Sequence, residues 1–425
     1  METLFCALAF LLLLQSFVAL LAGLRLARHA WRDPSSRFER YHPKVAIIVP
    51  CKGLDHGFEE NIRALFAQDY RDYELIFVTE SESDPAYDVL TRLIHESHRG
   101  AAWLVAAGES QNCGQKVHNL RAALNTLNAV DRRAEVIVFA DSDARPTINW
   151  LGELVTPLGD NRVGATTGFR WYLPIRGGFW SRLLSVWNAS TLTLLGEHSS
   201  LAWGGATAIR RENFDRLGIK QKWEGAVSDD YVLAKTVLAA GQRIEFVPPC
   251  LMASQSDVSL RELLEFTTRQ IRITRVYAPR LWWLALVSHT LYNFTFWGSL
   301  AWLAIKGFSS GRGDTLASIL IGIFALGTMS GWLRAAVASH SLAAHRQQLR
   351  KLQWAYVLLG PLVSILYLYN LLASVVTRRI VWRGIGYEML SPSKTLIWQR
   401  PASPVALDTS ALTSSRKASA SSSSS

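Results

Sequence analysis

Hydrophobic residues follow two different patterns along the 425-residue chain. Between residues 44 and 140, short apolar runs alternate with segments whose apolar positions recur at helical spacing. Strands that alternate with helices in this way predict a mainly parallel sheet with helices on both of its faces. The predicted strands and helices follow one another in this order: Val45–Val49, Asn61–Ala67, Glu74–Val78, Tyr87–Ile94, Trp103–Ala106, Lys116–Leu127 and Val136–Ala140.

The N-terminal apolar block, Leu4–Leu24, is about long enough to span a bilayer. The three residues before it carry no positive charge, which favours a signal anchor over a cleaved signal peptide. Arg25, Arg28 and Arg32 follow the block directly. Under the positive-inside rule, the chain therefore emerges from the membrane on its cytoplasmic side.

Three further apolar blocks follow the α/β region, and each is long enough to span: Leu281–Ile305, Leu316–Leu333 and Trp354–Val376. The basic loop Arg334–Lys351 should be cytoplasmic, so the first block runs outward and the second returns. A third crossing would then place the arginine-rich segment after residue 377 outside, against the same rule. An even number of crossings, or a re-entrant segment, would return this tail to the inside. Residues 403–425 are rich in Ser and Ala and are predicted to be disordered.

Composition narrows the choice of partners. Hydrophobic residues make up 49% of the chain and the net charge is +11. A basic excess suits anionic lipid or phosphate-bearing substrates, and no nucleic-acid-binding module accompanies it. The four cysteines are scattered without metal-binding spacing, so neither a disulfide framework nor a zinc site is expected. The chain also lacks a G-x-G-x-x-G turn and a P-loop.

Candidate chemistry begins where the predicted strand Val136–Ala140 ends in Asp141-Ser142-Asp143. Two carboxylates so close together repel each other unless a cation or a donor lies between them. Mg²⁺ or Mn²⁺ would suit, because these ions accept carboxylate and phosphate oxygens together. The alternative is that the aspartates cap the helix predicted after Pro146.

Other charged residues gather near the same strand ends. Glu80 and Asp84 follow the second strand, while Lys52 and Lys116 lie near the ends of the first and third. Each alone is typical of a solvated surface loop. At the carboxyl edge of one parallel sheet, however, they would offer carboxylates to a metal and lysines to phosphates.

The second half of the region holds two more candidate segments. Asp229 and Asp230 open a predicted helix, where one can serve as an N-cap and the other as a general base. Arg269 and Arg272 lie three residues apart in a predicted helix, Ser259–Tyr277, and so project from one side. They suit either the membrane surface or a diphosphate.

Two further segments lie between these candidates, one rich in apolar residues and one containing two glycines. Gly177–Gly196, rich in Trp and Leu, predicts a helix either in the membrane interface or in the domain core. The turn Trp203–Ala206 contains two glycines, which allow the backbone to approach a ligand closely, and precedes a short predicted strand, Thr207–Ile209.

Taken in order, these motifs resemble membrane-embedded glycosyltransferases of the ceramide glucosyltransferase type, whose pattern is D, D, D, (Q/R)xxRW. The resemblance extends from Lys44 to Arg280 and rests on five segments: Ser83–Val89, Gly114–Leu120, Asp141–Asp143, Asp229–Tyr231 and Arg269–Arg272. The sequence departs from the family at Ile273, where relatives carry the Trp that lines the acceptor pocket. Relatives that act on hopanoid lipids have a similar layout.

The resemblance implies a GT-A nucleotide-sugar-binding domain at residues 40–280, an anchor at 1–24, about three transmembrane helices at 281–376 and a tail at 377–425. The implied reaction is inverting transfer from a UDP-sugar, UDP-glucose in the type family, to a hydroxyl of a membrane lipid such as ceramide. The catalytic domain would face the cytoplasm. A processive polysaccharide synthase and a non-catalytic sugar-nucleotide binder are the alternative classes.

The resemblance also assigns roles to individual residues. Asp230 would be the general base. Asp141 and Asp143 would bind Mg²⁺ or Mn²⁺, and Asp141 would also belong to the donor site. The remaining residues assigned to nucleotide-sugar binding are Asp84, Lys116, Arg269 and Arg272.

Overall fold

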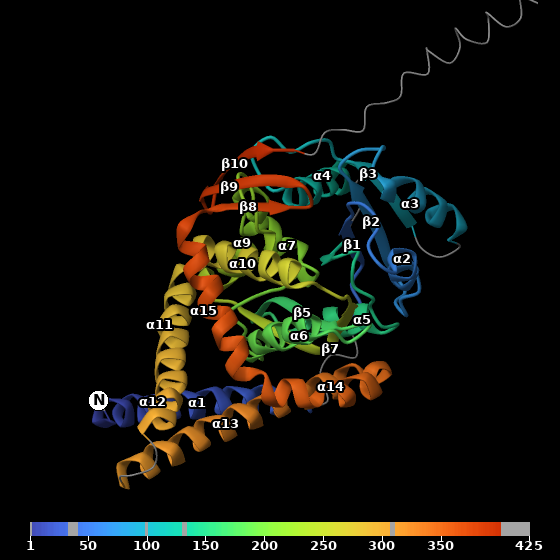
Figure 1. Ribbon diagram of the computed structural model, residues 1–425. Coiled ribbons are helices and arrows are strands. Elements are labelled where there is room, and N and C mark those ends of the chain that lie inside the picture. Colours follow the sequence, from blue (N-terminus) through green and yellow to red (C-terminus); the bar gives the residue numbers. More distant parts are fainter. Residues whose placement is uncertain (1, 33–40, 98–100, 130–133, 307–310, 401–425) are drawn as a thin grey trace, which may run out of the picture.

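The computed structural model describes residues 2–32, 41–97, 101–129, 134–306 and 311–400 (Figure 1). An α/β domain occupies one end of the molecule, and long helices from both ends of the chain extend from it (Figure 1). The mainly parallel α/β fold with added membrane helices that the sequence predicts is confirmed.

The domain is built on a seven-stranded sheet with strand order β3-β2-β1-β4-β6-β5-β7. Its strands are β1 (Val45–Pro50), β2 (Tyr73–Thr79), β3 (Ala101–Ala106), β4 (Val136–Ala140), β5 (Val163–Leu173), β6 (Ala206–Arg210) and β7 (Arg243–Gln255). The first four strands run parallel, and β6 is antiparallel to both of its neighbours. The carboxyl ends of β1 to β4 therefore meet along one edge.

Side chains that alternate along β1 build a separate core on each face of the sheet. Val45, Ile47 and Val49 pack with residues of α2, α3 and α5. Ala46 and Ile48 point to the opposite face, where α4 and α9 cover them. The helices of the domain are α2 (Phe58–Phe66), α3 (Pro85–Glu96), α4 (Gln115–Ala129), α5 (Trp150–Val155), α6 (Phe179–Thr191), α7 (Arg211–Arg216), α8 (Ile219–Lys222), α9 (Asp229–Ala239) and α10 (Leu260–Tyr277). Two short 3₁₀ turns, Thr156–Gly159 and Leu192–Leu194, complete it.

Helix α6 decides between the two interpretations of segment 177–196. Its central residues, such as Leu184 and Trp187, are buried in a core that also contains residues of β5, α1 and α14. Only its first residues, Phe179 and Trp180, expose large apolar side chains. The helix is thus a core element between the sheet and the long helices.

The long helices are α1 (Glu2–Ala30), α11 (Pro279–Tyr292), α12 (Gly298–Lys306), α13 (Gly311–Ser341), α14 (Arg346–Leu358) and α15 (Gly360–Val376). A π-helical turn, Asn293–Trp297, joins α11 to α12, and a 3₁₀ turn, Ala343–His345, precedes α14. Within the described residues, Thr3–Ala30 and Gly313–Ser341 are long and apolar enough to cross a membrane. The predicted span Leu281–Ile305 is divided by the π-helical turn and is not among these candidates.

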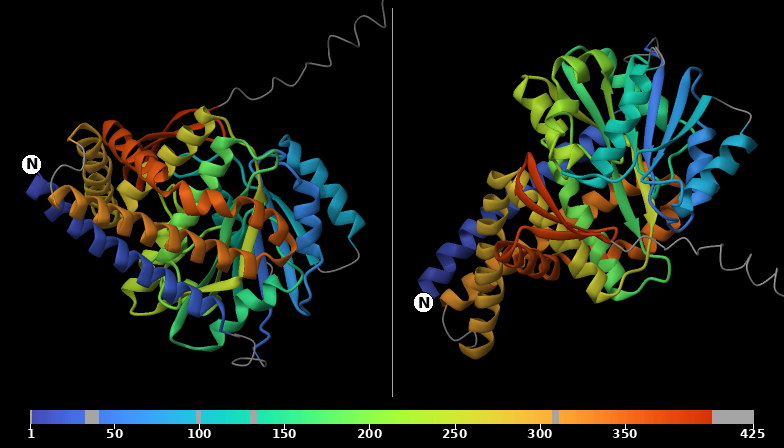
Figure 2. Two further views of the ribbon diagram at one scale, coloured as in Figure 1. Left: turned by 60° about the horizontal axis from the view of Figure 1, so that its bottom comes forward. Right: turned by 90° about the horizontal axis from the view of Figure 1, so that it is seen from above.

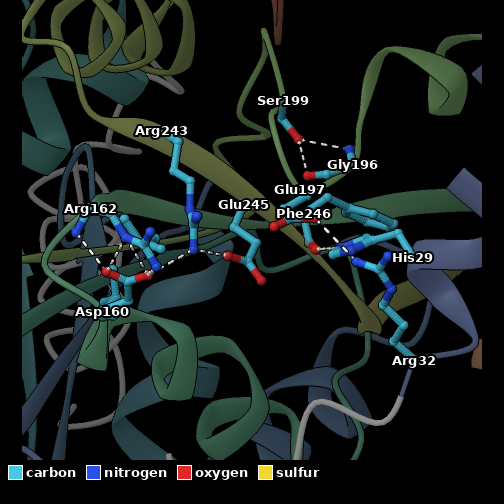
Figure 3. Close-up of polar contacts among 12 residues, drawn as sticks. His29, Arg32, Asp160, Arg162, Gly196, Glu197, Ser199, Arg243, Glu245 and Phe246 are labelled. Carbon is cyan, nitrogen blue, oxygen red and sulfur yellow. Dashed lines mark hydrogen bonds and ion pairs between the residues drawn. The ribbon is translucent and has the colours of Figure 1, made fainter. Parts of the chain in front are cut away.

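Helices α1 and α13 lie side by side and run in the same direction (Figures 1 and 2). Gly322 lies against Leu13, and Gly23 lies against Leu333, so the contacts advance together along both helices. Both helices end at the α/β domain. There, His29 at the end of α1 donates from Nε2 to the carbonyl oxygen of Phe246 in β7, 2.7 Å away (Figure 3).

The last apolar block does not form one straight helix. Helices α14 and α15 meet at an angle of 70° near Gly360, which suits a broken span or a re-entrant loop. A three-stranded antiparallel sheet follows, made of β8 (Arg379–Trp382), β9 (Ile385–Ser391) and β10 (Lys394–Gln399). This C-terminal sheet packs against the α/β domain, where Ile380 and Tyr387 share a buried cluster with Val227 of that domain. Residues 377–399 therefore lie on the same side as the domain, as an even number of crossings or a re-entrant segment would require.

The interval that was predicted to be disordered, 403–425, lies outside the described residues.

Candidate active site

Four charged side chains from three parts of the chain meet at the carboxyl edge of the sheet. Lys116, at the start of α4, places Nζ 2.9 Å from Oδ1 of Asp141 at the end of β4. Arg170 of β5 donates to Oδ2 of Asp141 and to Oδ2 of Asp143, each at 2.9 Å. The residues that the D-x-D motif and the lysine-bearing segment singled out are thus in direct contact.

Arg170 lies between the two aspartates, because its Nη2 atom also donates to Oδ1 of Asp143. Its guanidinium is 5.1 Å from the ring centre of Trp203 and 5.6 Å from that of Tyr172. Oxygens of both carboxylates therefore converge on one nitrogen, as they would on a single cation. Neither aspartate caps α5, which begins at Trp150, so the capping alternative does not describe their contacts.

The aspartate pair fits Mg²⁺ or Mn²⁺ as hard carboxylate ligands at one point, with room for phosphate oxygens in the remaining positions. No group of three or more His, Cys, Asp or Glu residues suited to a metal occurs in the part of the chain that the structure describes. An ion at Asp141 and Asp143 would thus take its further ligands from water or from a phosphate-bearing ligand.

Burial and ion pairing shift the pKa values of the cluster in opposite directions. Burial raises the pKa of Asp143 above its usual range, although Arg170 opposes the change. For Asp141, burial is outweighed by Lys116 and Arg170, and its pKa falls below the usual range. Burial opposes protonation of Lys116, but Asp141 and Asp229 raise its pKa. The cluster therefore holds ionised groups of both signs at neutral pH.

In the turn Trp203–Ala206, where the glycines were expected to let the backbone approach a ligand, both glycines lie against side chains of the site. A side chain at Gly204 would collide with Oδ2 of Asp229, and one at Gly205 would meet Asp141 and Trp203. The two glycines thus make room for carboxylates of the site rather than for a ligand alone.

Asp84 and Lys52 lie in loops at the same edge, after β2 and β1. Oδ1 of Asp84 accepts from the backbone N–H of Gly53 at 2.8 Å and from that of Ala86 at 2.9 Å. It thereby caps α3 and ties the loop after β1 to the end of β2. Lys52 forms an ion pair with Glu80.

The two aspartates at the start of α9 take different positions. Ser228 is the N-cap, and its hydroxyl donates to Oδ1 of Asp230, which also accepts from the backbone N–H of Tyr231. Asp230 is partly exposed. Asp229 is buried, with Oδ2 lying 3.5 Å from Nζ of Lys116. Burial, reinforced by Asp230 and opposed by Lys116, raises the pKa of Asp229 to about 6.

The two arginines of α10 point to different neighbours. Arg269 lies over the ring of Phe266, at 5.3 Å, and close enough to Tyr172 for its charge to act there. Nη1 of Arg272 donates to the carbonyl oxygen of Arg379 in the C-terminal sheet, 3.0 Å away. Burial lowers the pKa of both arginines. Arg269 therefore faces the aspartate cluster more closely than Arg272 does.

Ile273, at the position of the family tryptophan, is buried beneath the C-terminal sheet with Ile380 and Tyr387. Arg170 was not among the predicted site residues, and one of Asp229 and Asp230 was expected to cap α9, where the structure has Ser228 as the N-cap. Arg383 and Arg400, whose partners lie in loops at the strand ends, were also not predicted. A cation in the middle of an apolar strand, as in Phe169-Arg170-Trp171, was the available signal for Arg170.

A mainly parallel sheet with acids and a lysine gathered at its carboxyl edge, attached to candidate membrane helices, is the arrangement expected of a membrane-associated glycosyltransferase. The family model of glycosyl transferase family 21 matches residues 8–394. The chain belongs to this family.

Among curated proteins, it is similar to ceramide glucosyltransferases 1 and 3 of Caenorhabditis elegans, with 21% and 22% identity over 244 residues. The matches cover 56% of this chain and 51% and 52% of the relatives, so the chain spans about half the length of the curated relatives it matches. Among solved structures, a mannosyltransferase from Pyrobaculum calidifontis in complex with GDP-Man and Mn²⁺ is 20% identical. That match covers 88% of this chain and 98% of the other with a TM-score of 0.48, which is too low to bear on function.

Proposed function

We propose that this protein transfers a sugar from a UDP-sugar, with UDP-glucose as the leading candidate, to the hydroxyl of a membrane lipid such as ceramide, with inversion at the anomeric carbon. The observation that carries this proposal is the meeting of Lys116, Asp141 and Asp143 at one sheet edge, next to the aspartates that open α9. Such an edge suits a sugar diphosphate, and family 21 membership supports the reaction class.

The donor would lie along the strand ends. Asp84, in the loop beside Gly53, would hold the nucleoside side. Lys116 would exchange part of its pairing with Asp141 for a phosphate oxygen, and Arg269 and Arg272 would neutralise charge that grows on the leaving diphosphate. Asp141 and Asp143 would hold Mg²⁺ or Mn²⁺, which when bound neutralises and orients the diphosphate.

Asp230 would act on the acceptor. Its carboxylate, held by Ser228 and the first turn of α9, is partly exposed, whereas that of Asp229 is buried against Lys116. Asp230 would take the proton from the acceptor hydroxyl as the oxygen attacks the anomeric carbon, opposite the departing UDP. Attack from that side inverts the configuration.

A lipid acceptor follows from how α10 is attached. The helix that carries Arg269 and Arg272 passes through Ala278 directly into α11. It is also fixed to α15, because Asn370 accepts from Thr267 at 3.2 Å and from Thr268 at 3.0 Å. The site therefore stands beside helices of the membrane region. The basic residues after the apolar part of α1, Arg25, Arg28 and Arg32, favour a cytoplasmic position for the domain.

A transfer assay tests the proposal. Full-length protein in lipid nanodiscs would be supplied with radiolabelled UDP-glucose, Mn²⁺ and ceramide, and the labelled lipid would be identified by mass spectrometry. Asp230→Asn should lower kcat by about 10³-fold while UDP binding stays within about twofold. The matched control, Asp229→Asn, should change donor binding more than kcat. EDTA should remove activity, and Mn²⁺ should restore it.

Each failure of this assay has its own meaning. Loss of UDP binding in Asp230→Asn would refute the role of Asp230 as base. Transfer to a hopanoid or another lipid instead of ceramide would replace the acceptor only. Products with many sugars would indicate a polysaccharide synthase, and the absence of transfer to any tested lipid would favour a non-catalytic binder.

A further inference from the structure

The C-terminal sheet covers the nucleotide side of the site and contacts a loop at the end of each of the first three strands. Arg383 pairs with Asp55 after β1, and Arg400 pairs with Glu80 after β2, 2.8 Å away. The hydroxyl of Tyr387 accepts from the backbone N–H of Gln115, after β3, at 3.1 Å. Figure 1 shows this sheet next to α4 and α9. Nothing in family membership or in the proposed reaction assigns these contacts a role.

Arg383 stands out among these residues because of its backbone. It occupies the two-residue turn between β8 and β9 together with Gly384, with φ of 52° and 80°. Two positive φ values define a turn that favours Asn-Gly, and a long side chain at the first position is strained there. Arg383 is the one non-glycine residue with positive φ in the described chain. Such strain persists where the side chain has a task that outweighs it.

The position of the side chain indicates that task. Nη1 and Nη2 of Arg383 donate to Oδ1 and Oδ2 of Asp55, at 2.8 and 2.6 Å, while the arginine side chain remains 42% exposed. The guanidinium also lies close enough to Asp143 and Arg170 for their charges to act on its pKa. A further cation, in addition to Lys116 and Arg170, thus lies near the aspartate cluster and the space proposed for the diphosphate.

We propose that Arg383 is a donor-diphosphate-binding residue, brought to the site by the C-terminal sheet and held by Asp55 until the donor arrives. This inference rests on the proposed function. A guanidinium can bind two phosphate oxygens with the same fork that binds a carboxylate, so the exchange replaces one charged pair with another. The pair with Asp55 is partly exposed, at 42% and 22% of the two side chains, so a diphosphate that offers the same two-point contact can compete for the arginine.

Measurements of UDP binding can distinguish a diphosphate-binding Arg383 from one whose ion pair with Asp55 only holds the C-terminal sheet on the domain. Binding of UDP and of uridine to the full-length protein in nanodiscs would be measured by calorimetry with Mn²⁺ present. The test variant is Arg383→Asn, because Asn tolerates the left-handed backbone of the turn. Thermal unfolding of the variant would report whether the C-terminal sheet remains packed on the domain. Asp55→Asn removes the same ion pair from the other side. Arg379→Gln, on the same sheet and paired with Glu388 at 2.9 Å, is the matched control.

Arg383→Asn should weaken UDP binding about tenfold or more, leave uridine binding unchanged and keep the melting temperature within about 2 °C. Asp55→Asn should leave UDP binding unchanged or tighten it, and Arg383→Lys should fall between wild type and Arg383→Asn. Equal losses in Arg383→Asn and Asp55→Asn, or no loss in the former, would show that the pair only fastens the sheet. A wild-type protein that binds no UDP would overturn the proposed donor itself.

Discussion

Different forces hold the two sides of the site in place. On the strand-end side, Lys116 and Arg170 are fixed by ion pairs with Asp141 and Asp143. On the side of α9 and α10, apolar side chains such as Ile273 pack beneath the C-terminal sheet, and hydroxyls bind backbone groups. In the proposed mechanism, the first side exchanges one charged partner for another when metal and phosphate bind. The second is held mainly by apolar packing, which should keep Asp230 at a constant position.

The largest effect should follow from removing one carboxylate of the exchangeable side. Asp143→Asn leaves the shape of the site intact but halves the anionic charge offered to a divalent ion. Transfer should fall by about 10²- to 10³-fold. The assay is initial rate at saturating donor over a range of Mn²⁺, and circular dichroism confirms folding. A variant with wild-type rate would exclude Asp143 as a metal ligand.

Removing the cation between the carboxylates should mainly affect stability. Arg170→Gln leaves the partly buried Asp141 and Asp143 repelling each other, with only Lys116 still paired to Asp141, which should cost about 3 kcal/mol of unfolding free energy in the absence of metal. Mn²⁺ should restore most of the loss, because it can take the place of the guanidinium between the oxygens. Thermal unfolding with and without Mn²⁺ measures both effects. If Mn²⁺ stabilises this variant no more than wild type, the two carboxylates do not form its binding site.

The packed side should respond in the opposite way. Ile273→Ala creates a cavity beneath the C-terminal sheet and should cost about 2–4 kcal/mol. Neither Mn²⁺ nor UDP should restore this stability beyond the shift that each gives wild type. Thermal unfolding with and without Mn²⁺ measures the stability that the ion restores in Ile273→Ala, and the value for Arg170→Gln is the reference. Recovery as large as that of Arg170→Gln would remove the distinction between the two sides.

The smallest effect concerns Asp229, whose pKa of about 6 exceeds the ordinary value of 3.8. Because the folded state holds this proton more tightly, Asp229 lowers stability as pH rises from about 4 through 6. Asp229→Asn should remove this contribution, which we place at about 1–2 kcal/mol after allowing for its pairing with Lys116. Melting temperatures of both proteins between pH 4.5 and 7.5 provide the comparison. Parallel pH profiles would show that Asp229 does not titrate in this range.

The difference between the two sides also explains what the sequence could predict. Strand-end acids are visible because the carboxyl ends of parallel strands must share one edge, so β4 and its aspartates were placed together correctly. Arg170 was missed because β5 lacks a clear alternation of apolar and polar residues. Its importance depends on β6 inserting antiparallel between β4 and β5, which local pattern does not reveal.

The C-terminal sheet was missed for another reason. Its alternating apolar residues, Ile385, Tyr387 and Met389, were a usable strand signal, but the neighbouring arginines indicated a basic juxtamembrane tail. The bend near Gly360 could not be read from hydropathy, which records length and not direction. Asp84 was expected to bind the nucleotide-sugar donor. Its position directly before Pro85 also indicates the N-cap of α3 that the structure shows.

The first helix has a practical consequence for work with this enzyme. Leu26 and Ala27 of α1 are almost fully buried, in a core shared with Trp171 and Phe246 of the domain. Cutting the chain after this helix to obtain a water-soluble fragment would remove part of the interior and open it to solvent. Shortened forms should therefore aggregate, and purification is best planned around the intact chain in detergent or lipid from the start.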